Sequence, residues 1–202
     1  MSTTIVHLVR HGEVYNPAKI LYGRMPGYYL SSRGQSQAAR TARSFEGHDV
    51  TYLAASPLER AQETAAPISQ ITGCEVRTEE GVLEAGNRFE GLRVKGLRSQ
   101  LWNPVRWPLM VNPTLPSWGE HYDVILERMR AAIERARVAA EGHEAIVVSH
   151  QLPIVMVQRW AAGKPLAHNP ATRRCDLASV TSLIFQDEQL VEHRYSEPAQ
   201  EI

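Results

Sequence analysis

Residues 4–13 read TIVHLVRHGE, an apolar, β-branched run that ends abruptly in arginine, histidine and glycine. A short run of this kind is typical of a buried strand, so we expect a strand over residues 4–9. Arg10 and His11 then follow directly at its carboxyl end. Two further apolar runs, residues 50–54 and 145–148, are also expected to be strands, and each is followed by polar residues.

Helical patterns separate these strands along the chain. We expect helices after Ser32 as the N-cap, from Pro57 to about Ile71, over about 120–141 and over about 153–162, and a closing hairpin over 179–195. Strands that alternate with helices predict the α/β class: a three-layer sandwich with a mostly parallel central sheet flanked by helices. The length of 202 residues fits a single domain over residues 1–202.

Ligands of such sheets bind at the carboxyl ends of the strands. The polar segments Arg10-His11, Ser56–Arg60 and Ser149-His150 each follow a predicted strand, although they are far apart in the sequence. We therefore expect them to meet at one edge of the sheet.

An insertion with a different composition lies at about residues 86–118. It contains four prolines and three tryptophans, and its cations, Arg88, Arg93, Lys95, Arg98 and Arg106, are balanced by Glu90 alone. A long loop inside a compact domain is usually functional, so we interpret this segment as a lid. The cations suit either a second anionic contact with the substrate or a solvated face. The tryptophans suit either substrate selection or a small core within the lid.

The overall charge argues against a nucleic acid or a membrane surface as partner. Lys+Arg and Asp+Glu both number 22, and such a neutral balance is unlike proteins that bind nucleic acid or a membrane surface. No sequence signal indicates an oligomeric state. No signal peptide or apolar run of membrane-spanning length is apparent, which predicts a cytoplasmic location. Cys74 and Cys175 are about 100 residues apart and are interpreted as reduced, buried thiols.

Four segments carry the chemistry in a fixed order. They are LVRHGEVYN (8–16), SPLERAQETA (56–65), LEAGNRFEG (83–91) and VVSHQ (147–151). Together they resemble the histidine phosphatase (phosphoglycerate mutase-like) superfamily, in its small phosphatase branch. The resemblance covers nearly the whole chain, and it implies a phosphoglycerate mutase-like fold and a phosphohistidine intermediate. It also implies that the partner is a small-molecule phosphate ester.

The resemblance assigns roles to five residues. His11 is the nucleophile, because a neutral imidazole can attack phosphorus through one nitrogen while a hydrogen bond holds the other. Arg10 and Arg60 suit the phosphoryl oxygens, since guanidinium stays charged and binds phosphate in a planar, bidentate way. His150 is the second histidine of the family, and Glu84 matches the glutamate that protonates the leaving alkoxide.

Secondary contacts are assigned with some departures from the family pattern. Asn16 matches a phosphate-binding asparagine but lies one residue nearer to His11 than expected. Gly23 and Gln151 are expected to contribute backbone N–H groups to the substrate site. The glutamate segment is one residue shorter than usual between its acids, so Glu90 remains a second candidate for the acid.

Three functions remain open from the sequence. The first is a phosphatase that passes the phosphoryl group from His11 to water. The second is a phosphoglycerate mutase-type enzyme that returns it to another hydroxyl of the substrate, and the third is a non-catalytic phospholigand-binding module. None of the three needs a cofactor or a metal. His7 is interpreted as a core or sheet-face residue, and the remaining histidines, which show no metal-ligand spacing, as structural: His48, His121, His143, His168 and His193.

Overall fold

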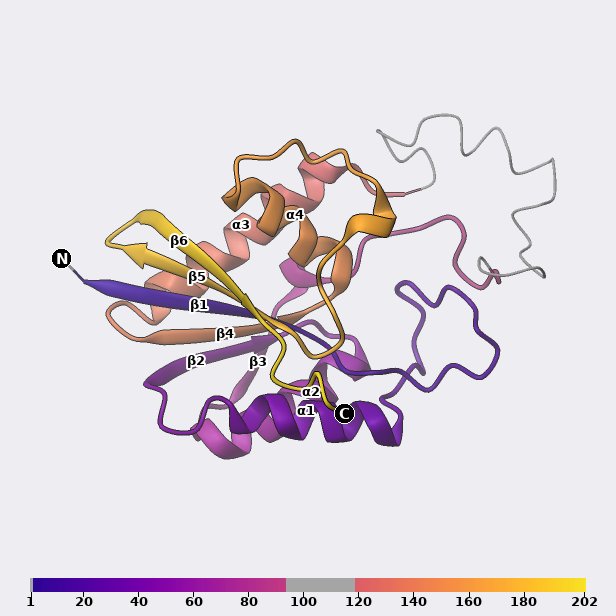
Figure 1. Ribbon diagram of the computed structural model, residues 1–202, viewed down its shortest axis with the longest axis horizontal. Helices are drawn as coiled ribbons and strands as arrows, with labels where there is room; N and C mark the ends of the chain where they lie inside the picture. The colour runs from indigo at the N-terminus through magenta and orange to yellow at the C-terminus, as the bar shows by residue number, and fades with distance from the viewer. Residues whose placement is uncertain (1, 94–118) are drawn as a thin grey trace.

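The computed structural model describes residues 2–93 and 119–202 of the chain. Its centre is a six-stranded sheet with the strand order β3-β2-β4-β1-β5-β6 (Figure 1). The strands are β1 (Thr3–Arg10), β2 (Val50–Ala55), β3 (Val76–Thr78), β4 (Glu144–Ser149), β5 (Val180–Gln186) and β6 (Gln189–Ser196). The pairs β1·β4, β4·β2 and β2·β3 are parallel, and β5 and β6 close the other side as an antiparallel hairpin.

Helices cover both faces of this sheet. α1 (Ser32–Arg43) and α2 (Glu59–Thr72) lie on one face, and α3 (Tyr122–Ala139) and α4 (Gln151–Ala161) lie on the other (Figure 1). Two short 3-10 helices, η1 (Glu80–Val82) and η4 (Pro170–Thr172), lie in the connections. The predicted α/β three-layer sandwich is therefore confirmed.

The alternation of side chains along the central strands divides the core into two parts. Val6 and Leu8 of β1 pack in the cluster under α3 and α4, together with Ile125 and Met129 of α3. Val9 points the other way, into the cluster under α1 and α2. Because β1 and β4 are covered on both faces, their central positions are mostly apolar, and these apolar runs made the two strands recognisable in the sequence.

Several element boundaries differ from the sequence-based expectation. The N-cap of α1 is Ser31 rather than Ser32, because the Ser31 hydroxyl accepts a hydrogen bond from the Gly34 N–H at 3.0 Å. α2 begins at Glu59, so Pro57 precedes the helix instead of opening it. α4 begins at Gln151, immediately after His150.

Two glycines bring the segment after β1 close to the start of α1. A Cβ atom on Gly12 would lie 2.5 Å from the Gly34 carbonyl oxygen, and one on Gly34 would lie 2.0 Å from the Glu13 carbonyl oxygen. Both distances are far below any real contact of a Cβ atom. The glycine that follows His11 is therefore required by packing, because α1 passes directly over it.

The expected lid at about 86–118 lies partly outside the described residues, since residues 94–118 are not among them. Its two ends meet at an isolated antiparallel bridge between Asn87 and Gly119. Of the two free cysteines, Cys175 is buried as expected, whereas Cys74 is partly exposed. Within the described ranges, no helix is long and apolar enough to cross a membrane.

Candidate active site

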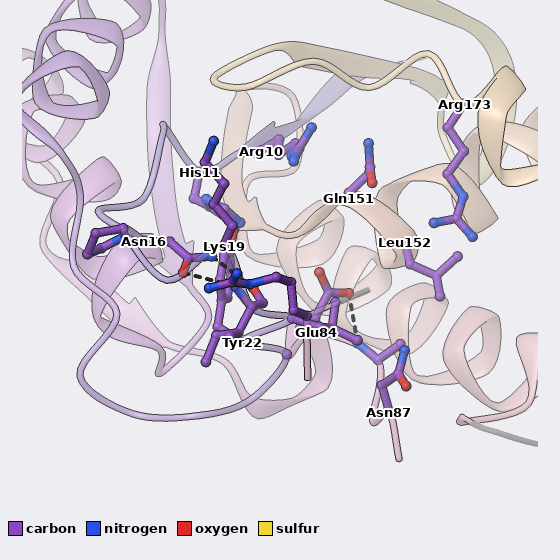
Figure 2. Close-up of a pocket in the computed structure, with 16 residues that line it drawn as sticks. Arg10, His11, Asn16, Lys19, Tyr22, Glu84, Asn87, Gln151, Leu152 and Arg173 are labelled. Atoms are coloured by element: carbon purple, nitrogen blue, oxygen red, sulfur yellow. Dashed lines mark hydrogen bonds between the residues drawn. The ribbon is translucent and has the colours of Figure 1, made fainter. Parts of the chain in front are cut away.

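The three polar segments converge at the carboxyl edge of the sheet, as the sequence predicted. Arg10 pairs with Ser149 across β1 and β4, and the His11 N–H donates to the Ser149 carbonyl at 3.1 Å. The Ser56 N–H donates to the Val148 carbonyl at 2.9 Å, which fixes the end of β2 beside them. A cavity of about 790 Å³ opens above this edge, within the size range of small-molecule sites. Figure 2 shows Arg10, His11, Glu84 and Gln151 among its lining residues.

His11 is held in one orientation by its own backbone. Its Nδ1 lies 2.8 Å from the carbonyl oxygen of Gly12, which can only accept, so Nδ1 carries the proton and Nε2 keeps its lone pair. The side chain is buried, and the pKa of His11 is lowered well below its usual value, by burial first and then by Arg10 and Arg60. The imidazole is therefore neutral near pH 7, the state that a nucleophile requires.

His150 lies beside His11, with 5.1 Å between the ring centroids. Its Nε2 lies 2.8 Å from the Ser56 hydroxyl, and both side chains are buried. Burial, followed by the charges nearby, also lowers the pKa of His150 well below its usual value. With Ser56 as the donor to Nε2, Nδ1 carries the proton of the neutral ring and can donate to a ligand.

Unpaired nitrogens surround this pair of histidines. Within residues 2–93 and 119–202, the buried side-chain nitrogens that have no hydrogen-bond partner are Arg10 Nε, Arg60 Nε and Nη1, and His150 Nδ1. Buried polar groups are nearly always hydrogen-bonded, so several unpaired nitrogens near one another indicate that they bind a ligand. Three of these atoms belong to guanidinium groups, and the partner that fits is an anion.

Arg60 is the most enclosed of these cations. Its side chain is 0% exposed, and Nη2 donates to the Gly23 carbonyl at 2.6 Å. The guanidinium carbon also lies 4.8 Å from the centre of the Tyr22 ring, a cation–π contact. Arg10 is anchored similarly, through a 2.6 Å hydrogen bond from Nη1 to the Cys175 carbonyl. Each guanidinium is thus held at one end, while its Nε has no hydrogen-bond partner among the described residues. Arg10 lines the cavity, whereas Arg60 lies behind its wall.

Glu84 lines the same cavity. Burial raises its pKa, and this effect outweighs the lowering by the Ala85 N–H, which donates to Oε1 at 2.8 Å, and by the nearby arginines. A carboxyl group of this kind keeps its proton to higher pH, as a general acid should. Glu90 is different: its Oε1 accepts from the Arg24 N–H at 3.0 Å, and it does not line this cavity. The geometry favours Glu84 of the two candidates.

The backbone that carries Glu84 is clamped by two arginines. Arg24 Nε donates to the Glu84 carbonyl at 2.6 Å, and Arg128 Nη1 donates to the Leu83 carbonyl at 2.7 Å. Both guanidinium groups also bind Glu120, at 2.8 Å and 2.9 Å. Sequence reasoning gave neither arginine a role, since only the fold brings residues 24, 84, 120 and 128 together.

The loop between β1 and α1 forms one wall of the cavity. Glu59 and Glu63 of α2 hold it by accepting from the N–H groups of Gly27 at 2.9 Å and Leu30 at 2.6 Å. Gly23 lies in this wall with a φ of +43°, a conformation that favours glycine, and a Cβ there would meet the Glu90 carboxyl group. The loop is therefore positioned by acids on the helix that also carries Arg60.

The three expected secondary contacts all line the cavity: Asn16, Gly23 and Gln151. The Asn16 side chain is engaged at both ends, because Nδ2 donates to the Ile20 carbonyl at 2.8 Å and Oδ1 accepts from the Ile20 N–H at 3.2 Å (Figure 2). Here Asn16 braces the loop. Gln151 is the first residue of α4, so its N–H group has no partner within the helix.

Further cavity residues were missed by sequence reasoning. Arg173 follows η4, donates from Nε to His168 at 2.8 Å, and has a pKa lowered by burial. Lys19 and Tyr22 come from the loop after β1, and Figure 2 shows all three around the cavity. None of them lies in one of the four motif segments, and a cation in a loop carries no sequence signal of its own. Arg93, which was noted as a lid cation, also lines the cavity.

The cavity is suited to an anion rather than to a metal ion. In the part of the chain that the structure describes, Glu84 is its only acidic lining residue, against Arg10, Lys19, Arg93 and Arg173. A hard metal ion prefers several carboxylate or carbonyl oxygens. The chemistry available is instead attack by His11 Nε2 on a centre whose negative charge the arginines and His150 bind, with Glu84 as proton donor.

Comparison with known proteins agrees with this arrangement. Residues 6–198 match the histidine phosphatase superfamily (branch 1). The chain is 49% identical over 197 residues to the uncharacterized protein Rv0525 of Mycobacterium tuberculosis, covering 97% of each chain. It is 30% identical over 186 residues to a probable phosphoglycerate mutase, GpmB, of Photorhabdus laumondii, covering 90% of this chain and 85% of the other. Among solved structures, Bacillus stearothermophilus YhfR superposes with a TM-score of 0.79 at 21% identity, covering 93% and 94% of the two chains.

Proposed function

Because the chain belongs to the histidine phosphatase superfamily, we propose that it is a phosphatase that hydrolyses small-molecule phosphate monoesters through a phosphohistidine on His11. The observation that carries the proposal is the group of unpaired buried nitrogens on Arg10, Arg60 and His150. A monoester phosphate has the charge and the number of acceptor oxygens to satisfy them.

In the first step, the lone pair of His11 Nε2 attacks phosphorus. A P–N bond forms and the P–O bond to the leaving alkoxide breaks, while Glu84 transfers its proton to that oxygen. The arginines and His150 bind the phosphoryl oxygens, where charge stabilisation has its largest effect. The Gly12 carbonyl stabilises the ring as it gains positive charge, because it accepts from Nδ1.

In the second step, water attacks the phosphohistidine. Glu84, now ionised, accepts a proton from that water, a P–O bond forms, and the P–N bond breaks to return neutral His11. Pro17 and Lys19 at the cavity wall are exposed, which leaves a path for water. No metal ion is needed for either step, and the enzyme is expected to work in the presence of a chelator.

A mutase is the second candidate, favoured by the 30% identity to a probable phosphoglycerate mutase. Such an enzyme would use the same first step but return the phosphoryl group to a second hydroxyl of the substrate. We favour hydrolysis because water is always available to a phosphohistidine in an open cavity, whereas mutase chemistry needs water to be excluded.

The test is phosphate release from a panel of monoesters with chelator present. The panel contains p-nitrophenyl phosphate, 3-phosphoglycerate, sugar phosphates and nucleotides, and it compares wild type with His11→Ala and with His193→Ala, an exposed histidine on β6. We expect release by wild type and His193→Ala and only background by His11→Ala. An acid-labile phosphoenzyme should be trapped in wild type and His193→Ala but not in His11→Ala.

Two other results would contradict the proposal in different ways. Accumulation of 2-phosphoglycerate from 3-phosphoglycerate, with little free phosphate, would identify a mutase. Release at only the background rate by both wild type and His11→Ala, with every member of the panel, would favour a phospholigand-binding module. Equal release above background by the two proteins would show that His11 is not the nucleophile.

A further inference from the structure

A second group of histidines lies at the opposite edge of the sheet. His7 of β1, Glu144 at the start of β4 and His48 in the connection before β2 converge there. The three potential ligand atoms all lie within 4.8 Å of one another. His7 and His11 are four residues apart on an extended chain, roughly 13 Å, so this cluster is separate from the active site.

Two imidazole groups share a single carboxylate oxygen in this cluster. Glu144 Oε2 lies 2.9 Å from His7 Nε2 and 2.7 Å from His48 Nδ1. Each ring can move its proton to its other nitrogen. The nitrogen beside Glu144 then has a free lone pair with which to bind a cation.

His7 has the kind of hydrogen-bond partner that usually orients a metal-binding histidine. Its Nδ1 lies 2.8 Å from the Ser182 hydroxyl on β5, which can donate or accept and so permits either tautomer. Metal-binding histidines almost always have such a partner on their second nitrogen. Phe45 packs against both rings, with centroid distances of 5.1 Å to His7 and 5.6 Å to His48. The site thus has an apolar wall behind its ligands.

We propose that His7, His48 and Glu144 form a binding site for a divalent transition-metal ion of the Zn²⁺ type. Imidazole nitrogens with one carboxylate oxygen suit Zn²⁺ and its neighbours better than Mg²⁺ or Ca²⁺, which prefer oxygen ligands. Three protein ligands leave the fourth tetrahedral position for water. Glu144 Oε2 and each ring nitrogen must separate to roughly 3.3 Å, as tetrahedral bonds of about 2.0–2.1 Å require. His48, whose side chain is 40% exposed, has room to move.

The expected role of the ion is structural. It would join β1, β4 and the segment before β2, which are distant in the sequence, at the end of the sheet away from the substrate. An ion that binds only the folded protein stabilises it in proportion to its occupancy. Zn²⁺ should therefore raise the melting temperature without being required for phosphoryl transfer.

The experiment uses the full chain without a histidine tag, stripped of metal by a chelator that is then removed. Zn²⁺ binding is measured by calorimetry and by metal content after gel filtration, and the visible absorption of bound Co²⁺ reports its geometry. The variants are His48→Ala, Glu144→Gln and Ser182→Ala. His143→Ala is the matched control, because His143 precedes Glu144 but pairs with Asp49 at 2.6 Å instead.

We expect one Zn²⁺ per chain in wild type and in His143→Ala, and at least about tenfold weaker binding in His48→Ala and Glu144→Gln. Loss of the outer-shell hydroxyl in Ser182→Ala should weaken binding about 10- to 100-fold. All four variants should keep the monoesterase activity of wild type, which verifies that they are folded. Measuring Zn²⁺ binding by His11→Ala as well distinguishes binding at the cluster from binding at the histidine pair of the active site.

Any of three results would overturn the proposal. They are equal Zn²⁺ affinity in wild type and His48→Ala, an equal loss in His143→Ala, and loss of the ion in His11→Ala. The first two would mean that the ion binds elsewhere or not at all, and the third that it binds in the active site.

Discussion

The Ser56 hydroxyl lies 2.8 Å from Nε2 of His150, and the two residues are brought together from the ends of β2 and β4. Nδ1 of the same ring is buried and has no partner among the described residues. When Ser56 donates to Nε2, the ring proton is on Nδ1, where it can contact a phosphoryl oxygen. We therefore expect Ser56 to be a positioning residue that selects the tautomer of His150, for which we propose a catalytic role.

Ser56→Ala should lower kcat/KM for monoesters roughly 10- to 100-fold, the equivalent of leaving one buried group unpaired at ~1–3 kcal/mol. Nitrogen NMR of the His150 ring should show a changed tautomer population. Ser149→Ala is the control, because Ser149 is equally buried at the same edge but donates to the Val82 carbonyl. Equal losses in both variants, with no change in the ring signals, would refute the positioning role.

Glu84→Gln should discriminate between leaving groups. An alkoxide needs a proton from Glu84, whereas p-nitrophenolate leaves without one, so we expect a loss of about 10²–10⁴-fold for alkyl phosphates and a much smaller loss for p-nitrophenyl phosphate. The measurement is kcat/KM for both substrates in wild type and variant, because kcat/KM reports the first step alone, whereas the second step uses Glu84 with every substrate. Glu90→Gln, on the same segment, should leave the ratio between the substrates unchanged. If Glu90→Gln alters that ratio and Glu84→Gln does not, the acid is Glu90.

The pH dependence of activity should follow from the pKa values of His11 and Glu84, which are shifted in opposite directions. Burial lowers the pKa of His11, so the nucleophile stays neutral and active well below pH 6.5. Burial raises the pKa of Glu84, so its proton is present below that raised value and lost as pH rises through it. The rate ratio of wild type to Glu84→Gln on an alkyl phosphate should therefore fall with rising pH. The titration of the substrate is the same in the assays of wild type and Glu84→Gln and cancels in the ratio. A ratio that stays constant with pH would therefore exclude Glu84 as the acid.

Arg60→Lys should keep the charge but lose the planar donors that are unpaired in the buried guanidinium. We expect kcat/KM to fall about 10²–10³-fold, as is common when a preorganised donor is removed from a reacting group. Inhibition by inorganic phosphate should weaken as well. Arg43→Lys, an exposed change on α1, is the control and should behave as wild type. Wild-type phosphate affinity in Arg60→Lys would show that the guanidinium does not contact the anion.

Gly34→Ala should reverse the usual effect of alanine in a helix. Alanine normally stabilises a helix interior by about 0.5–1 kcal/mol relative to glycine. At Gly34 the new Cβ would lie 2.0 Å from the Glu13 carbonyl oxygen, so we expect destabilisation of about 1–3 kcal/mol. Ser36→Ala, an exposed change on the same helix, should alter the free energy of unfolding by less than about 0.5 kcal/mol. Urea denaturation measures both, and a stabilised Gly34→Ala variant would contradict the close approach.

The sequence by itself determined the fold class and the main catalytic candidates. Apolar runs such as residues 4–9 and 145–148 identify buried parallel strands, because a strand covered on both faces has no polar side to alternate with. Once the strands were known, Arg10, His11 and His150 had to meet, since the carboxyl ends of parallel strands share one edge. Helix starts were less certain, because the choice of Ser31 over Ser32 as N-cap depends on backbone angles and not on residue type.

Only the tertiary structure decided which atoms are available for chemistry. The free nitrogen of His11, the pairing of His150 with Ser56 and the position of Arg173 all depend on contacts that the sequence pattern does not encode. The same holds for His7, His48 and Glu144, which show no metal-ligand spacing along the chain and yet share one oxygen. Local propensities specify strands and helices, but residues separated by about 100 positions meet only when the sheet and its connections assemble.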